Sequence, residues 1–103
     1  MLKDKLLGLS VSLIDESIVE IFRFASDHLA ATIGTKGGPV CAPILALEIV
    51  GPVSLRIVGQ GFRISWDQVE IGPERLSVRR NGIPAQYRID RQSVGPDCRE
   101  EPA

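Results

Sequence analysis

The sequence of 103 residues has the length of one compact domain, and its 44% hydrophobic content is enough for a real core. Only 5% of the residues are aromatic, so we expect that core to be mainly aliphatic. The 12 basic and 13 acidic residues leave a net charge of −1, without the excess positive charge of a general nucleic-acid-binding protein. No apolar run is long enough to cross a membrane. We therefore expect a small domain with neither nucleic-acid nor membrane partners.

Alternation of apolar and polar residues is the main structural signal, and its period of two is typical of β-strands. The run from Leu9 to Leu13 alternates apolar residues with serines, after one or two helical turns over residues 1–7 that end at Gly8. The expected strands span residues 9–13, 18–24, 29–33, 44–50, 53–57, 62–71, 75–80 and 85–90. A helix over residues 16–31 is the alternative to the second and third strands, but the β-branched and aromatic residues there favour strands.

The clearest turn is Asn81-Gly82, which lies between two alternating runs. Both residues tolerate the positive φ of a type I′ turn, so this pair predicts a β-hairpin. Pro84 follows closely, and we expect the last strand to pair fully only beyond it. The glycine-rich loop at residues 34–39 is expected to extend through Pro43, because proline in a central strand removes a ladder hydrogen bond.

About eight short strands with a turn signal roughly every ten residues are typical of an all-β sandwich or barrel. No segment long enough for a crossover helix separates the strands, so they should pair as antiparallel hairpins. A meander leaves two exposed edges unless it closes, and we therefore predict an up-and-down β-barrel. The alternative is a strongly bent open sheet that a dimer partner completes. Residues 1–90 should form this single domain, and residues 91–103 are expected to be a disordered C-terminal tail.

The order of these features resembles that of the lipocalin-like, or calycin-type, small β-barrels. Over most of residues 7–90 the chain has a short N-terminal helical turn, a glycine (Gly8) that enters the first strand, and a meander that ends in Tyr-Arg-Ile at residues 87–89. Ser10 stands where the family pattern has a tryptophan. The resemblance implies a barrel that binds or senses a ligand, often without catalysis.

A barrel of this size is either just filled by its side chains or holds one small ligand. The residues expected to face inward are mostly large and aliphatic: Leu9, Val11, Leu13, Phe22, Phe24, Ala31, Ile33, Leu45, Leu47, Ile49, Val53, Leu55, Ile57, Ile64, Trp66, Leu76, Val78, Tyr87 and Ile89. Those expected to contact a small apolar ligand in a cavity are Phe22, Phe24, Leu47, Trp66 and Tyr87. The indole and phenol would supply the few polar groups of such a site. A filled core is the alternative, and Lys36 is expected on a loop at the barrel mouth.

No catalytic constellation stands out. His28 follows Asp27, but nothing identifies a nucleophile, so we expect a turn histidine that faces solvent. In residues 34–38 the lysine precedes the final glycines and no helix follows, so the segment is not a phosphate-binding loop. Cys41 and Cys98 lie far apart and predict free thiols in a reducing, cytoplasmic location. We expect no cofactor, no metal and no enzymatic activity; the remaining enzyme hypothesis would use Asp27, His28 or Cys41.

Arginines crowd the last hairpin, and they are Arg75, Arg79, Arg80, Arg88 and Arg91. Acidic residues lie close to them in sequence, at Asp67, Glu70, Glu74 and Asp90. We therefore expect a solvated face of mixed charge; binding of an acidic partner or a carboxylate ligand is the alternative. Arginines on an edge strand also discourage aggregation.

Residues 44–50 are apolar on nearly both faces. Because a small barrel covers only the inner face, Ile44, Ala46 and Val50 would need a second cover, from the N-terminal turn or from another copy of the chain. A homodimer through residues 44–50 is one expectation. The leading hypothesis for function is a non-enzymatic barrel that binds a small apolar ligand or serves as a structural module. The alternative is a protein–protein interaction or oligomerisation domain with a filled core.

Overall fold

The computed structural model describes residues 2–25 and 29–90, so the expectations for His28, Cys98 and the C-terminal tail lie outside the described residues. Within these ranges the chain has a five-residue helix, α1 (Leu2–Leu6), and no helix long and apolar enough to cross a membrane. The strands are β1 (Leu9–Leu13), β2 (Ile18–Phe24), β3 (Leu29–Thr35), β4 (Val40–Gly51), β5 (Ser54–Gly59), β6 (Phe62–Trp66), β7 (Gln68–Ile71), β8 (Arg75–Arg80) and β9 (Ile83–Asp90).

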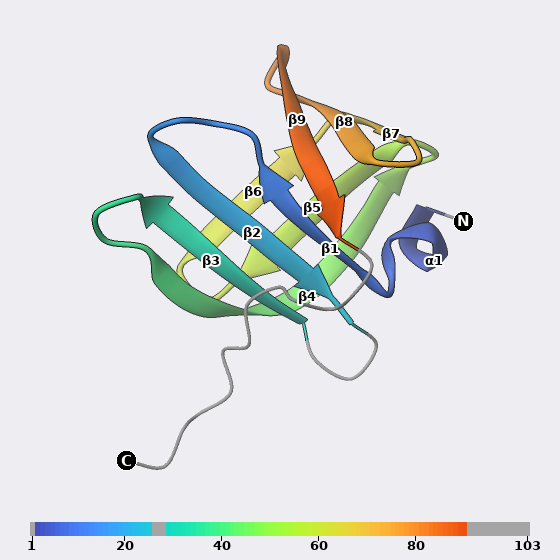
Figure 1. Cartoon of the computed structure of the whole chain (residues 1–103). Coiled ribbons are helices and arrows are strands. Elements are labelled where there is room, and N and C mark those ends of the chain that lie inside the picture. Colours follow the sequence, from blue (N-terminus) through green and yellow to red (C-terminus); the bar gives the residue numbers. More distant parts are fainter. Residues whose placement is uncertain (1, 26–28, 91–103) are drawn as a thin grey trace.

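The strands form one antiparallel sheet in the order β6-β5-β4-β3-β2-β1-β9-β8-β7. The first and last strands pair, with Ser10 opposite Asp90, so the meander curls back on itself (Figure 1). The result is a nearly closed barrel with one unsealed seam, between β6 and β7. The predicted all-β antiparallel meander is confirmed. Its single strand over residues 62–71 is divided in two, because β6 pairs with β5 whereas β7 pairs with β8.

Asp67, the residue between β6 and β7, joins the two sides of the seam. Its backbone N–H donates to the carbonyl oxygen of Arg79 at 2.7 Å, and its own carbonyl oxygen accepts from the Ser54 hydroxyl at 2.7 Å. Its carboxylate accepts from the backbone N–H of Asn81 at 3.0 Å. One residue therefore holds β5, β8 and the β8–β9 turn together where strand pairing stops.

The β8–β9 hairpin has the predicted turn. Asn81 and Gly82 have φ values of 51° and 81°, as the type I′ turn requires. The expectation that pairing begins only after Pro84 is wrong, since β9 starts at Ile83, opposite Arg80. The next pair after the closing pair of such a hairpin is a non-hydrogen-bonded pair, so Pro84 removes no ladder hydrogen bond there.

Strand β4 departs most from its prediction. It begins at Val40 and includes Pro43, which lies just before a register shift between Ile44 and Ala46. Proline is tolerated next to such bulges. The bulge reverses which residues face inward: Ile44 is 6% exposed and Leu45 is 64% exposed, the opposite of the predicted orientation. Ile44 therefore needs no second cover.

The inward faces of the strands make one hydrophobic core. Its largest fully buried side chains are Trp66, Tyr87, Phe22 and Phe24, which lie among aliphatic residues from most of the strands. Leu6 of α1 is also fully buried in this core, and α1 contacts β4. The short helix therefore covers part of the barrel interior, as Figure 1 shows at the right.

Candidate functional site

The five residues expected to contact a ligand are all part of the core. The ring centroids of Trp66 and Tyr87 are 5.0 Å apart, and those of Phe22 and Trp66 are 5.6 Å apart in an edge-on arrangement. Phe24 stacks beside Phe22 at 6.0 Å, and Leu47 belongs to the same cluster. None of the five lines the hollows described below. Ligand contact by these five residues stays a prediction.

A polar cluster lies next to the aromatic side chains, formed by Glu20 of β2, Arg80 of β8 and Tyr87 of β9. Arg80 Nη1 donates to both carboxylate oxygens of Glu20 at 2.7 Å, and the Tyr87 hydroxyl donates to Glu20 Oε1 at 2.7 Å. Arg80 Nη1 also lies 3.3 Å from the Tyr87 oxygen. The side chains of Arg80 and Glu20 are only 29% and 8% exposed. Three strands are thus tied together by charged and polar groups that point into the barrel.

The environment keeps Tyr87 protonated and Arg80 charged. Burial raises the pKa of the Tyr87 phenol, and the hydrogen bond to Glu20 and the charge of Glu20 raise it further, against smaller opposite effects of Arg80 and Trp66. Burial alone would lower the pKa of Arg80, but the hydrogen bond to Glu20, the neighbouring Tyr87 and the charge of Glu20 raise it overall. The cluster is therefore a balanced ion pair with a phenol as an additional donor.

This cluster opens to solvent through a hollow of about 410 Å³ between the β1–β2 connection and the β8–β9 hairpin. We call this part of the barrel the Glu20 end; both segments that form it lie at the top of Figure 1. Glu20, Arg80 and Gln86 contribute polar groups to the lining. The apolar part of the lining includes Leu13, Ile14, Ile18 and Ile83, of which the three isoleucines are exposed. Apolar walls around a few directed polar groups are typical of small-molecule sites.

The β1–β2 connection is held by Asp15. Its carboxylate accepts hydrogen bonds from the backbone N–H groups of Ser17 and Ile18 at 2.8 Å and 3.0 Å, and these lower its pKa. Lys36 lies nearby, since its backbone N–H donates to the Ser17 carbonyl oxygen at 3.3 Å and its charge also favours ionised Asp15. Lys36 lines an adjoining hollow of about 330 Å³ together with Glu20. It therefore lies at the Glu20 end, and its role at a barrel mouth stays a prediction.

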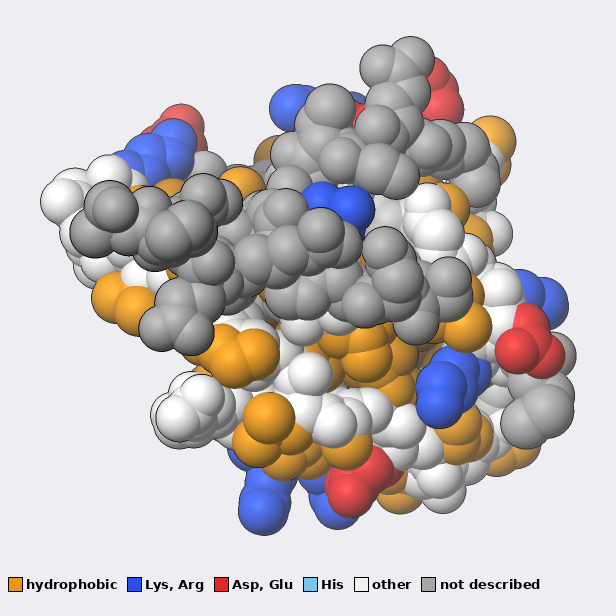
Figure 2. Space-filling model, turned by 90° about the horizontal axis from the view of Figure 1, so that it is seen from below, with side chains coloured by type: hydrophobic (Ala, Val, Ile, Leu, Met, Phe, Trp, Pro, Cys, Tyr) orange, Lys and Arg blue, Asp and Glu red, His pale blue; other side chains and the backbone are white. Residues whose placement is uncertain are grey.

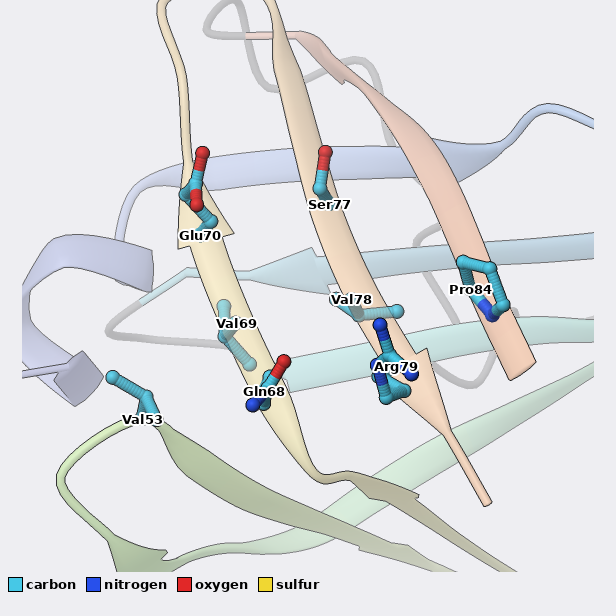
Figure 3. Close-up of a pocket in the computed structure, with 8 residues that line it drawn as sticks. All are labelled: Val53, Gln68, Val69, Glu70, Ser77, Val78, Arg79 and Pro84. Atoms are coloured by element: carbon cyan, nitrogen blue, oxygen red, sulfur yellow. The ribbon is translucent and has the colours of Figure 1, made fainter. Parts of the chain in front are cut away.

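A second hollow of about 410 Å³ lies over β7 and β8. Figure 3 shows Gln68 and Arg79 side by side on these two strands, with Val53 on the nearby β4–β5 turn. The polar residues that line it, Gln68, Glu70, Ser77 and Arg79, are exposed or half-buried. None of these polar side chains is held in one orientation by burial, as Glu20 and Tyr87 are. We therefore regard the Glu20 end as the stronger candidate.

Comparison with family models, with curated proteins and with solved structures finds no match for this chain. The candidate site therefore rests on geometry alone. In the described ranges, no group of three or more His, Cys, Asp or Glu side chains is arranged to hold a metal ion.

Sequence reasoning missed two of the three cluster residues. Arg80 was expected on a solvated face, but it points inward and pairs with Glu20. Arg80 is two residues from the buried Val78, and Glu20 is two residues from the buried Phe22, so each shares the inward face of its strand. The period of two was therefore the signal available for both. Charged residues are rarely buried, and this general rule favoured a solvent-exposed position for Arg80.

Cys41 is disulfide-bonded, so the expected free thiol is wrong. Spacing along the sequence therefore did not decide the state of Cys41, which is exposed on β4. The thiol argument for a cytoplasmic location therefore no longer holds, and that location stays a prediction without this support.

Proposed function

We propose that the chain is a non-enzymatic β-barrel module that binds a small, partly apolar molecule at the Glu20 end. The observation that carries this proposal is the Glu20–Arg80–Tyr87 cluster, which is partly buried yet lines an open hollow with exposed isoleucines. Burying an ion pair costs several kcal/mol in desolvation, and apolar residues of similar size are often at least as stabilising. A binding role accounts for keeping the charges at this place.

The proposal retains a lipocalin-like barrel but places the ligand at one end of it instead of in its centre. A nearly closed antiparallel barrel suits a ligand-binding module, since barrels of this size often take their ligand at or within one end. Here Phe22, Trp66 and Tyr87 occupy the middle of the barrel and contact one another. The ligand is accordingly assigned to the hollow beside the aromatic side chains and not to the space between them.

An NMR fragment screen on the full chain tests this proposal. We expect small amphipathic fragments to shift backbone amide signals of residues 13–20 and 80–86 and to leave the rest of the barrel unchanged. Ile83→Asp should abolish these shifts, because it places a charge on the apolar wall. Val50→Asp is the matched control, since Val50 is similarly exposed at 59% against 69% for Ile83 but lies away from the hollow. Shifts confined to other surfaces, or unchanged in Ile83→Asp, would contradict the proposal.

An interaction or oligomerisation domain is the second candidate, and the exposed apolar side chains of β4 and its following turn favour it. Val40, Leu45, Val50 and Val53 are between 48% and 65% exposed. Figure 2 shows hydrophobic side chains gathered on the lower face of the molecule among charged side chains of both signs. A homodimer through residues 44–50 would cover Leu45 and Val50.

Light scattering at increasing protein concentration tests this second candidate. The dimer predicts a doubled mass that Leu45→Glu returns to that of the monomer, whereas Ile83→Glu, which changes the Glu20 end, leaves the dimer intact. A monomer mass at every concentration would exclude the dimer.

A further inference from the structure

We infer that the ligand of the Glu20 end has an uncharged hydrogen-bond-accepting head, such as the carbonyl of a carboxamide or ketone, joined to a compact apolar tail. The inference rests on the proposed function of the same hollow. It specifies the chemical class of molecule that this hollow would select.

Some hydrogen-bond donors of the Arg80 side chain have no acceptor among the described residues. A guanidinium carries five N–H groups, and among the described residues every hydrogen bond that Arg80 makes through its side chain starts from Nη1. The N–H groups of Nη2 and Nε therefore have no protein acceptor there. The Arg80 side chain lines the hollow and is 29% exposed, so these donors can reach a bound molecule. An acceptor on the ligand would satisfy them.

The charges around the hollow argue against an ionic head. The Glu20 carboxylate already neutralises Arg80 at 2.7 Å. Asp15 also lines the hollow, and the positive charge of Lys36, which lines the adjoining hollow together with Asp15, favours its ionised form. A ligand carboxylate would place a second anion near Glu20, and a ligand ammonium would approach the Arg80 cation. Either head would also lose its hydration shell, whereas a carbonyl loses much less.

The rest of the lining sets the form of the ligand. Ile14, Ile18 and Ile83 offer apolar surface that is 42%, 44% and 69% exposed in the free protein. Covering this surface with a compact hydrocarbon group would contribute roughly 25 cal/mol for each Å² removed from water. The hollow thus combines an apolar wall with donors on one side.

Three probes with one tail and different heads test the inference: cyclohexanecarboxamide, cyclohexanecarboxylate and cyclohexylmethylammonium. Each is titrated into the full chain and followed by backbone NMR shifts and by the fluorescence of Trp66, the only tryptophan of the sequence. Trp66 contacts Tyr87, which donates to Glu20, so binding at the Glu20 end should alter its emission. We expect the carboxamide to bind at least about tenfold more tightly than either ion, which corresponds to about 1.4 kcal/mol.

Arg80→Lys separates recognition of the head from folding. Lysine keeps the positive charge opposite Glu20 but lacks the planar fork of donors, so the barrel should stay folded. We expect the preference for the carboxamide to fall to within about threefold of the ions, a loss of roughly 0.7 kcal/mol or more. Arg56→Lys is the matched control, because Arg56 also pairs with a glutamate, Glu48, at 3.1 Å but does not line the hollow.

The outcomes distinguish this inference from the proposed function. Tighter binding of the carboxylate or the ammonium in the hollow, or a carboxamide preference unchanged in Arg80→Lys, would overturn the inference and leave a ligand site in place. Absence of binding by all three probes, when library fragments do bind in the hollow, would also overturn the inference alone. Absence of any binding in the hollow, in both experiments, would overturn the proposed function as well.

Discussion

A double-mutant cycle at Glu20 and Arg80 is the most direct test of the cluster. The changes are Glu20→Leu, Arg80→Met and the two together, which replace charged side chains by apolar ones of similar volume. Removing one partner of a fully buried pair destabilises a protein by about 3–5 kcal/mol, because the other charge stays buried without compensation. The 29% exposure of Arg80 admits water and lowers this loss, so we expect about 2–4 kcal/mol for each single variant.

The double variant should be far less affected. With both charges gone there is no ion to desolvate, and Leu and Met can pack against the neighbouring aliphatic side chains. The free energy of unfolding should then fall by about 0–1.5 kcal/mol, which leaves a coupling energy of at least about 2 kcal/mol. For a domain of this length, each lost kcal/mol lowers the melting temperature by roughly 4–8 °C, so the difference is measurable by heat or by urea.

The chain supplies its own control. Glu48 and Arg56 form an ion pair across β4 and β5 at 3.1 Å, with side chains 49% and 40% exposed. An exposed pair of this kind contributes about 0–1 kcal/mol, so its cycle should show little coupling. The reasoning fails if urea unfolding gives additive losses within about 0.5 kcal/mol at Glu20 and Arg80, or if both cycles give the same coupling.

Three further predictions follow from single positions. Folding raises the pKa of Tyr87, so wild type should lose stability relative to Tyr87→Phe as the pH rises through 10.0, where an unfolded tyrosine ionises; a constant difference in urea unfolding from neutral to alkaline pH would contradict this. Asp67→Ala should destabilise by about 1 kcal/mol and speed exchange of the Asn81 amide hydrogen, whereas Asp67→Asn, which keeps an acceptor, should do neither. Gly59→Ala should destabilise by about 1–3 kcal/mol because the new methyl group would overlap the ring of Phe62, and Phe62→Ala in the same chain should recover part of that loss.

The elements that sequence patterns predicted correctly are those with strictly local causes. Asn81 and Gly82 adopt positive φ because their side chains permit it, and this property is independent of the rest of the chain. The alternation of apolar and polar residues similarly required strands, and the lack of a crossover segment required an antiparallel meander. Local chemistry was therefore sufficient for the fold class.

The features that escaped prediction depend on distant partners. Glu20 and Arg80 are 60 residues apart in sequence, so the local sequence around each one does not indicate that the two pair inside the barrel. Strand β4 is apolar on both faces, so no alternation showed that a bulge places Ile44 inward and Leu45 outward. The division at Asp67 likewise depends on pairing with Arg79, which no local pattern reveals.

Tyr87 shows why a filled barrel and a ligand site are compatible in this protein. Its ring packs against Trp66 in the closed core, while its hydroxyl donates to Glu20 at the edge of the hollow. The packed ring fixes where the hydroxyl points, and the hydroxyl in turn holds the carboxylate that orients Arg80. Filling the centre of the barrel is therefore what orients the polar groups at its end, and a molecule bound there would change the surroundings of Trp66 without entering the core.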